Sequence, residues 1–293
     1  MQILGLDIGY GDTKIKTQEL ETKIPTAVSK VKEAFVEFGK PEGYLYNGKR
    51  YNLGDNGLMG AYNTRSFNFL LNYAPLLIFK SIEIAGFDIN EPIHLKTGLS
   101  LFNWKEKEEF IEKIKTIRVN DQVINLKISL MAQGEGVFRE YDGDKSGMVC
   151  IADMGYNTFD FLVFINGVPQ PGLSFANNQG VNEIIVDLKS KLQKKYSFNI
   201  SEQAVKKAFI DGYIMSFGEK VDLSIDIQES KEEYAQKMFE ELESHRNDIL
   251  QSADKIIFSG GGAYFFDGID LKKNMMLSNT PYEFSNVRGY FKS

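Results

Sequence analysis

The sequence has one cysteine, one tryptophan and two histidines among 293 residues, and these scarcities exclude whole classes of site. A single cysteine, Cys150, leaves no partner for an internal disulfide and rules out a zinc site built from several cysteines. It lies in an apolar stretch, where we expect a small buried side chain. His94 and His245 are far apart in sequence with no nucleophile nearby, so we interpret them as a strand residue and a helix-surface residue.

Long apolar runs are also missing. The most apolar stretch, Phe67 to Phe79, is interrupted by Asn68, Asn72 and Pro75 and is too short to span a bilayer. Met1 leads directly into an apolar strand pattern, without the segments of a signal peptide. We therefore expect a cytoplasmic protein with no membrane contact.

The charge balance has little in common with that of a nucleic-acid-binding protein. The net charge is −6 and the pI is near 5.2, which argues against direct, charge-driven binding of DNA or RNA and leaves open a contact through a basic partner. A GxxxxGK[ST] loop is absent, since the nearest approach, Gly143 to Ser146, lacks the glycine before the lysine. The composition, 43% hydrophobic and 25% charged, and the length are typical of a folded protein with two domains.

What the chain does contain is one pattern that occurs twice. Residues 3–14 read Ile-Leu-Gly-Leu-Asp-Ile-Gly-Tyr-Gly-Asp-Thr-Lys, and residues 150–160 read Cys-Ile-Ala-Asp-Met-Gly-Tyr-Asn-Thr-Phe-Asp. Each copy is an apolar strand ending on an aspartate, followed by an apolar residue, a glycine and a tyrosine. A glycine after the aspartate lets the backbone turn sharply and bring its N–H groups close to a ligand. An ordinary hairpin turn remains the alternative for either loop taken alone.

The two loops together predict a duplicated fold that holds one phosphate chain from both sides. The candidate phosphate-binding residues are Gly9, Tyr10, Gly11, Asp12, Thr13 and Lys14 in the first loop and Gly155, Tyr156, Asn157 and Thr158 in the second. In this arrangement Thr13 would add a hydroxyl and Lys14 a positive charge. Asp7 and Asp153 would face each other, and such a pair suits Mg²⁺, which binds one or two carboxylates through retained waters together with phosphate oxygens.

A third loop, Gly260-Gly261-Gly262, ends an apolar strand and is expected to open a helix at Ala263. Three glycines would let a flat ring lie against the backbone, and a helix N-terminus favours anionic or electron-rich groups. A flexible helix start is the alternative. Because the order of the three loops is much rarer than any one of them, the sequence predicts a nucleotide site.

The candidates for the residue that orients or deprotonates an attacking water are Gln133 and Glu135, at the end of a predicted strand. Glycines flank Glu135 and leave room for a nucleotide. Both side chains could instead cap a helix beginning near Val137.

The pattern of apolar residues predicts two halves that meet at a polar, turn-rich break over residues 142–147. In residues 1–147 we expect strands at 2–7, 13–18 and 22–27, a small inserted subdomain over 28–66, helices at 67–86 and 104–117, and strands at 92–98 and 123–131. In residues 148–282 we expect strands at 148–154, 158–165 and 168–175, helices at 180–195 and 230–250, a helix opening after Ser201 as N-cap, a strand or hairpin at 212–227 and a strand at 255–259. This order indicates an α/β fold with helices on the faces of mixed sheets.

These residues resemble the actin-like ATPase superfamily, in which two ribonuclease-H-like domains close on ATP in a cleft between them. Residues 7–14 look like its first phosphate motif, residues 153–158 like its second, and residues 259–262 like its adenosine motif. Within the superfamily the chain is most similar to the ParM/StbA plasmid-partition actins and their archaeal relatives, which also share segments similar to 171–180 and 286–290. The resemblance implies that a C-terminal helix over about 283–293 packs back on the first domain.

The resemblance further implies a protein that polymerises into filaments with Mg-ATP, or with GTP, and hydrolyses the nucleotide. Asp7 and Asp153 would hold Mg²⁺, Gln133 or Glu135 would position the water, and the partners would be further copies of the chain and a DNA-binding adaptor. The implied role is plasmid or DNA segregation or a prokaryotic cytoskeleton. A small-molecule (sugar-type) kinase and a nucleotide-binding scaffold of the same superfamily remain alternatives.

Overall fold

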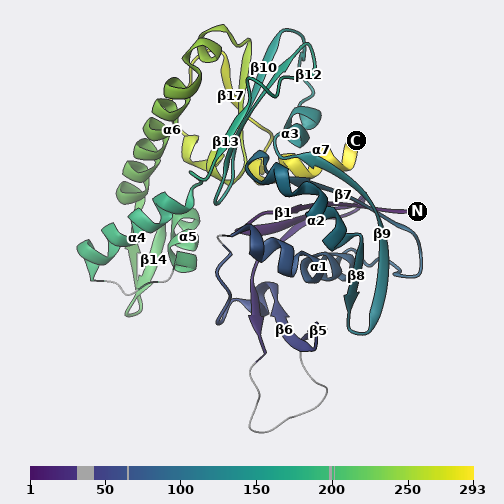
Figure 1. Cartoon of the computed structure of the whole chain (residues 1–293). Helices are drawn as coiled ribbons and strands as arrows, with labels where there is room; N and C mark the ends of the chain where they lie inside the picture. The colour runs from purple at the N-terminus through teal and green to yellow at the C-terminus, as the bar shows by residue number, and fades with distance from the viewer. Residues whose placement is uncertain (32–42, 65, 198–199, 201) are drawn as a thin grey trace.

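The computed structural model describes residues 1–31, 43–64, 66–197, 200 and 202–293. Figure 1 shows these residues as two α/β lobes, with the last helix, α7 (Ser285–Lys292), lying between them. The first strand begins and the last helix ends on the same side of the molecule (Figure 1).

The first lobe is built on a mixed sheet with the strand order β3-β2-β1-β7-β9-β8. Its strands are β1 (Gln2–Ile8), β2 (Asp12–Lys16), β3 (Glu21–Pro25), β7 (Ile93–Leu99), β8 (Thr116–Val119) and β9 (Gln122–Ala132). Strands β1, β7 and β9 run parallel to one another. Their carboxyl ends therefore meet at one edge of the sheet, where an α/β sheet usually binds ligands.

Apolar side chains from helix and sheet form the core of this lobe. The helix α1 (Phe67–Ile84) buries Ala74, Leu77 and Ile78 against Leu4 and Leu6 of β1, and all five side chains are fully buried. Burying one such aliphatic side chain contributes about 1.5–3 kcal/mol. A short helix, α2 (Lys107–Ile114), also packs on this core, and a small sheet sits beside it, formed by β4 (Val28–Lys30), β5 (Tyr44–Tyr46) and β6 (Lys49–Leu53) and followed by the 3₁₀ turn η1 (Gly54–Gly57).

The second lobe repeats the central arrangement of the first. Its sheet has the order β12-β11-β10-β16-β17, with β13 also paired to β11. The strands are β10 (Met148–Met154), β11 (Phe159–Ile165), β12 (Val168–Pro169), β13 (Phe175–Asn177), β16 (Lys255–Ser259) and β17 (Met275–Leu277). Its other elements are α4 (Asn182–Tyr196), α5 (Glu202–Asp211), the hairpin β14–β15 (Tyr213–Ser216 and Glu219–Asp222), α6 (Ser224–Ser252), and the 3₁₀ turns η3 (Gly261–Phe266) and η4 (Tyr282–Phe284). In both lobes an antiparallel hairpin lies beside a parallel strand, β1–β2 beside β7 and β10–β11 beside β16.

Strand β10 is buried on both faces, which explains its continuous apolar sequence. Cys150 and Ala152 point into the core beneath α4 and α6, whereas Val149 and Ile151 point into a separate cluster. That cluster includes Val137 of α3 (Glu135–Glu140), the helix that follows β9 of the first lobe. Successive side chains of a strand point to opposite faces, so a strand covered on both sides is apolar throughout.

The helix α7 makes unusually close backbone contact with α3 and β7. A methyl group at Gly289 would overlap the carbonyl oxygen of Gly136, and one at Gly98 would overlap the Tyr290 ring. Lys96 of β7 donates hydrogen bonds to the carbonyl oxygens of Phe291 and Ser293. Two glycines facing each other let the helices approach more closely than any other residue pair would.

Most expected elements are present, and four expectations were wrong in extent or type. The strand expected at 168–175 is two short pieces, because Pro169 and Pro171 lack the N–H that a continuous ladder needs. The helix expected at 104–117 begins as a 3₁₀ turn, η2 (Leu101–Glu106), and β8 replaces its end. The third glycine loop opens a 3₁₀ turn, and α6 takes over the last residues of the expected hairpin region. Ser201, expected as an N-cap, lies outside the described residues, as do residues 32–42 and 65 of the expected subdomain over 28–66.

We predict that Gly289→Ala destabilises the chain by about 2 kcal/mol or more, because overpacking has no room to relax between two backbones. Gly172→Ala is the matched control, since nothing lies within 4 Å of a Cβ placed at Gly172. Urea unfolding of both variants and the wild type measures the difference in free energy of unfolding. Equal stability of the two variants would contradict the close contact between α3 and α7.

Candidate functional site

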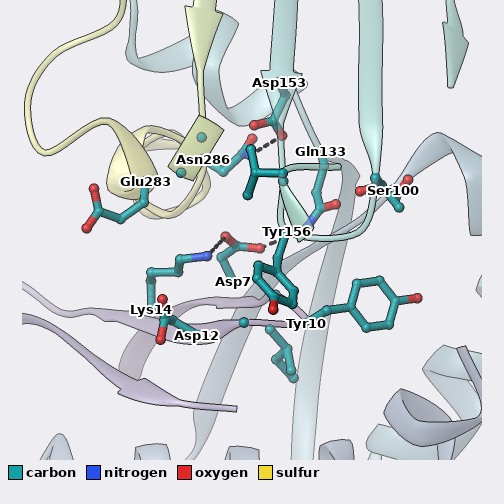
Figure 2. Close-up of a pocket in the computed structure, with 18 of the residues that line it drawn as sticks. Asp7, Tyr10, Asp12, Lys14, Ser100, Gln133, Asp153, Tyr156, Glu283 and Asn286 are labelled. Carbon is teal, nitrogen blue, oxygen red and sulfur yellow. Dashed lines mark hydrogen bonds and ion pairs between the residues drawn. The ribbon is translucent and has the colours of Figure 1, made fainter. Parts of the chain in front are cut away.

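A cavity of about 480 Å³ lies between the two lobes, at the carboxyl ends of β1, β7, β9 and β10. Figure 2 shows how side chains from both lobes point into it. Thirteen of the seventeen predicted site residues line it: Asp7, Gly9, Tyr10, Gly11, Asp12, Lys14, Gln133, Asp153, Gly155, Tyr156, Thr158, Gly260 and Gly261. Segments separated by more than 250 positions in sequence thus meet around one cavity.

The two phosphate-loop candidates have the same backbone geometry. The N–H of Gly9 donates to the carbonyl of Asp12 at 3.2 Å, and the N–H of Gly155 donates to the carbonyl of Thr158 at 2.8 Å. The residue seven positions after each aspartate lies opposite it in the hairpin, so that Lys14 faces Asp7. The corresponding partner of Asp153 is Asp160. The two loops are therefore structural copies that carry opposite charges at equivalent positions.

Asp7 is held by two side chains of its own lobe. Its carboxylate accepts a hydrogen bond from Nε2 of Gln133 at 2.9 Å and lies 3.4 Å from Nζ of Lys14. Burial lowers the pKa of Lys14, but the carboxylates of Asp7 and Asp12 outweigh burial and raise that pKa above its ordinary value. Lys14 therefore remains charged although it is largely buried. Its side chain lines the cavity, where its charge favours an anion.

Asp153 is almost completely buried at the end of β10. Its carboxylate accepts a hydrogen bond from Nδ2 of Asn286 at 2.6 Å. Burial raises the pKa of Asp153 to about 6, and the charge of Asp7 adds to the increase, whereas Asn286 and Lys14 oppose it. The two carboxylates thus influence each other across the cavity, as expected for a pair that faces a common ligand.

The structure separates the two candidates for positioning water. Gln133 lines the cavity and donates to Asp7. Glu135 is the first residue of α3 and does not line the cavity; its carboxylate pairs with Arg139 one helical turn later, at 2.6 Å. Glu135 is therefore occupied on the helix surface, and Gln133 has the better position.

Three other predicted residues lie away from the cavity. The Thr13 side chain is fully buried and its hydroxyl is hydrogen-bonded to Thr26 at 2.8 Å. Asn157 is buried beneath the second loop, where its Oδ1 accepts from Asn182 and its Nδ2 donates to the carbonyl of Thr64. Gly262 serves packing, because a Cβ there would come within 2.5 Å of Met154 Cβ. The side chains of these residues support the loops and are not offered to a ligand.

Sequence analysis missed several lining residues because they come from helices and turns without a motif. Lys206 of α5 lies 3.4 Å from Asp12 and 5.1 Å from the centre of the Tyr156 ring. Burial raises the pKa of Asp12, but Lys206 and Lys14 more than compensate and hold it below its ordinary value. Lys206 thus connects the second lobe to the first loop of the first lobe.

A second ion pair at the cavity joins the beginning of the chain to its last segment. Lys23 of β3 forms an ion pair with Glu283 at 2.8 Å, and Glu283 also accepts a hydrogen bond from the Tyr264 hydroxyl. Burial raises the pKa of Glu283, but the hydrogen bonds from Lys23 and Tyr264 keep it below its ordinary value. Both ion pairs have one partner on the first sheet and one in the second half of the chain.

The two ends of the cavity differ in chemistry. One end has the loop backbones, Asp7, Asp153 and Lys14. The other end is lined by apolar and aromatic side chains of α4, α5 and η3, namely Val181, Ile185, Phe209, Ile210 and Phe265. Phe209 and Phe265 stack with their ring centres 4.4 Å apart. A charged end beside an apolar end suits a ligand that joins phosphates to a flat ring.

The donor set also fits a magnesium ion that arrives with phosphate. Among the residues that the structure describes, no group of three or more His, Cys, Asp or Glu side chains is placed to hold a metal ion. Asp7 and Asp153 alone offer two carboxylates, and Mg²⁺ commonly uses one or two together with waters and phosphate oxygens. The site therefore suits Mg²⁺ as part of a metal–nucleotide complex better than a free cation.

Asp160 supplies a third buried carboxylate, just behind the cavity. It accepts hydrogen bonds from the Ser100 hydroxyl at 2.9 Å and from the Leu101 N–H at 2.7 Å, so β11 is tied to the end of β7. Burial raises the pKa of Asp160 to about 7, and the charge of Asp153 adds to the increase. Asp160 was not predicted, because its hydrogen-bond partners are 60 positions away in sequence.

Comparisons with known proteins agree with this architecture. The family model for the N-terminal domain of actin-like proteins matches residues 5–136, and the model for the C-terminal part of the archaeal MreB-like actin homologue matches residues 151–270. No match was found among curated proteins. No helix within the described ranges is long and apolar enough to cross a membrane.

Solved structures are similar over the whole chain. The archaeal actin homologue Ta0583 in complex with ADP has 19% identity and a TM-score of 0.77, with 100% of this chain and 98% of that chain covered. A 15-stranded ParM filament from Clostridium botulinum has 19% identity and a TM-score of 0.78, with 99% and 98% covered. ParM from Bacillus thuringiensis with AMPPNP has 17% identity and a TM-score of 0.70, with 100% and 98% covered. These likenesses confirm the expected two-lobed fold.

The buried Asp160 generates a prediction about stability and pH. The folded chain holds a proton on Asp160 up to about pH 7, whereas the unfolded chain releases it near the ordinary value of 3.8. Its contribution to the free energy of unfolding is therefore fully present below about pH 4 and is lost as the pH rises through about 7. The asparagine of Asp160→Asn does not ionise. The free energy of unfolding of this variant, relative to that of the wild type, should therefore increase by on the order of 1 kcal/mol from pH 5.5 to pH 8.

Urea unfolding at the two pH values, without nucleotide or Mg²⁺, measures this gain. Asp187→Asn, at an exposed position on α4, is the control and should show no such dependence. A difference between Asp160→Asn and wild type that is the same at both pH values would refute a raised pKa of Asp160.

Proposed function

The chain belongs to the actin-like ATPase superfamily, and from that premise we propose that it binds Mg-ATP, hydrolyses it and assembles with copies of itself into filaments. The observation that carries the proposal is the pair of matching loops, each beside a buried aspartate, on a cavity that is charged at one end and apolar at the other. GTP fits the same description and is the other candidate nucleotide.

The proposed roles follow from the positions of the residues. The backbone N–H groups of residues 10–12 and 156–158 and the ammonium of Lys14 would bind the phosphates, with Gly9 and Gly155 shaping the two loops through their internal hydrogen bonds. Asp7 and Asp153 would hold Mg²⁺ through water, and the ion would neutralise charge on the phosphates when bound. Gly260 and Gly261 would border the base. The binding unit comprises domain I, residues 1–147 with the helix of 283–293, and domain II, residues 148–282.

Gln133 is the residue we assign to the attacking water. Its amide is already fixed by the hydrogen bond to Asp7, so the remaining acceptor atom is held in one orientation at the charged end of the cavity. An amide in such a place orients a water molecule without removing its proton, the role that glutamine has in other nucleotide hydrolases. This arrangement suits slow hydrolysis that follows assembly.

Assembly would follow from two properties. A head-to-tail contact between unlike surfaces does not close on itself and produces an open filament. The ion pair Lys206–Asp12 crosses between the lobes beside the cavity, so a bound nucleotide would bias how the lobes close. Solved structures with this fold include the ParM filament and an Alp12 filament.

We propose DNA segregation, or a cytoskeletal role, in the cytoplasm as the cellular task. The net charge of −6 disfavours direct binding to DNA, so cargo would be attached by a basic DNA-binding adaptor. The adaptor would recognise the assembled form.

The central test is right-angle light scattering of the purified chain with Mg-ATP, recorded together with phosphate release. We expect scattering to rise and then to decay as phosphate appears, and no rise with ADP. Asp153→Ala should abolish phosphate release. Phosphate release without scattering at any protein concentration would favour the kinase alternative, and the absence of both signals would favour a nucleotide-binding scaffold.

Gln133→Ala should lower the rate of hydrolysis by roughly a hundredfold while nucleotide binding changes little, because positioning of the attacking water is lost. Glu135→Ala should hydrolyse at nearly the wild-type rate, because Glu135 pairs with Arg139 outside the cavity. Single-turnover phosphate release and titration with a fluorescent ATP analogue separate the two effects. If Glu135→Ala were the slow variant, the water would have to be assigned to Glu135.

A further inference from the structure

Asn286 of α7 lines the cavity and contacts both lobes through hydrogen bonds at opposite ends of its amide. Its Nδ2 donates to Asp153 Oδ2 at 2.6 Å, and its Oδ1 accepts from the Gly134 N–H at 2.8 Å. The residue is buried and lines the cavity. Its contacts lie 133 and 152 positions away in sequence, so the bridge is entirely a product of the fold.

The Gly134 N–H needs such a partner. Gly134 precedes the first residue of α3, and its φ of +86° is a conformation that side chains rarely adopt. The first N–H groups of a helix have no acceptor within that helix. A buried N–H without a partner costs roughly 1–3 kcal/mol, and Asn286 removes that cost.

Gly134 is also the immediate neighbour of Gln133. The Gln133 N–H donates to the carbonyl of Leu99 at 2.9 Å, and the Gln133 side chain donates to Asp7. The N–H groups of Gln133 and Gly134 are thus both hydrogen-bonded, to Leu99 and to Asn286. These two bonds fix the backbone from which the Gln133 side chain extends. Figure 2 shows these side chains together, with dashed lines that join Lys14 and Gln133 to Asp7 and Asn286 to Asp153.

The side-chain chemistry at position 286 is restrictive. An amide presents a donor and an acceptor at opposite sides of one group, as this bridge requires. An aspartate would keep the acceptor for Gly134 but would place a second carboxylate against Asp153. Asn286 also has little freedom to move, because Gly289, on the next turn of α7, contacts the backbone of Gly136.

We propose that Asn286 is a positioning residue that fixes Gly134, and through it Gln133, relative to Asp153. It couples the residue that orients the attacking water in domain I to the carboxylate that faces the metal–nucleotide complex in domain II. The assignment to hydrolysis rests on the proposed function, whereas the bridge between the lobes does not.

Two measurements on the full chain test the proposal, and they separate it from the proposed function. Amide hydrogen exchange of the peptide spanning residues 131–138 tests the bridge without any need for hydrolysis. Asn286→Ala should accelerate exchange in that peptide by tenfold or more. Tyr290→Phe is the matched control on the same helix, because the Tyr290 hydroxyl is buried with no hydrogen-bond partner among the described residues; it should leave exchange unchanged.

Single-turnover phosphate release tests the consequence. Asn286→Ala should lower the rate roughly ten- to hundredfold with at most a small change in ATP-analogue affinity, and Asn286→Asp should be at least as slow. In the Gln133→Ala background, Asn286→Ala should add little, because both substitutions remove the same positioning. If Asn286→Ala instead caused a general structural defect, its loss of rate would multiply with the loss of rate caused by Gln133→Ala.

The outcomes separate as follows. Unchanged exchange in Asn286→Ala would overturn the bridge. Accelerated exchange with wild-type hydrolysis, or full multiplication with Gln133→Ala, would overturn the positioning role. Wild-type hydrolysis by Asn286→Asp would show that the hydrogen bond to Asp153 is not needed. If the wild-type chain releases no phosphate, the proposed function fails, and accelerated exchange would still support Asn286 as the link between the lobes.

Discussion

Two aspartates that are almost completely buried, Asp7 and Asp153, end the central strands of two sheets and face one cavity. Removing two like charges from water is costly unless donors or cations meet them. The surrounding residues supply those groups, with Lys14 and Gln133 at Asp7 and Asn286 at Asp153. The raised pKa of Asp153 shows that compensation is incomplete on that side. The Asp153 side of the site therefore suits a cation, and Mg²⁺ bound to a nucleotide would supply one.

The two lobes are alike because each contains a copy of the same hairpin, but the side chains of the two hairpins have different roles. Equivalent positions carry Lys14 in the first hairpin and Asp160 in the second. In the proposed role the first hairpin would offer the charge of Lys14 to the ligand, whereas in the second hairpin the Asp160 carboxyl group accepts hydrogen bonds from the Ser100 hydroxyl and the Leu101 N–H of the first lobe. One copy of the motif would contact the ligand through a side chain, and the other joins the two lobes.

The two loops and the fold could be predicted from sequence, because a glycine after an aspartate at a strand end is a local signal. The roles of Thr13, Asn157 and Gly262 could not, since the direction of a side chain depends on strand register and on neighbours such as Thr26 and Asn182. Gln133 and Glu135 differ by two positions across a strand-to-helix boundary, and the left-handed Gly134 between them decides which one enters the cavity. Lys206, Glu283 and Asn286 lie outside any motif. Their placement depends on contacts between residues more than a hundred positions apart.

The position of α7 has a consequence for how the protein is made. Residues 285–292 are translated after every other described element, yet they occupy the space between the lobes and supply the amide that bridges Gly134 and Asp153. Synthesis from the N-terminus to the C-terminus thus delays completion of the cavity until α7 has been made.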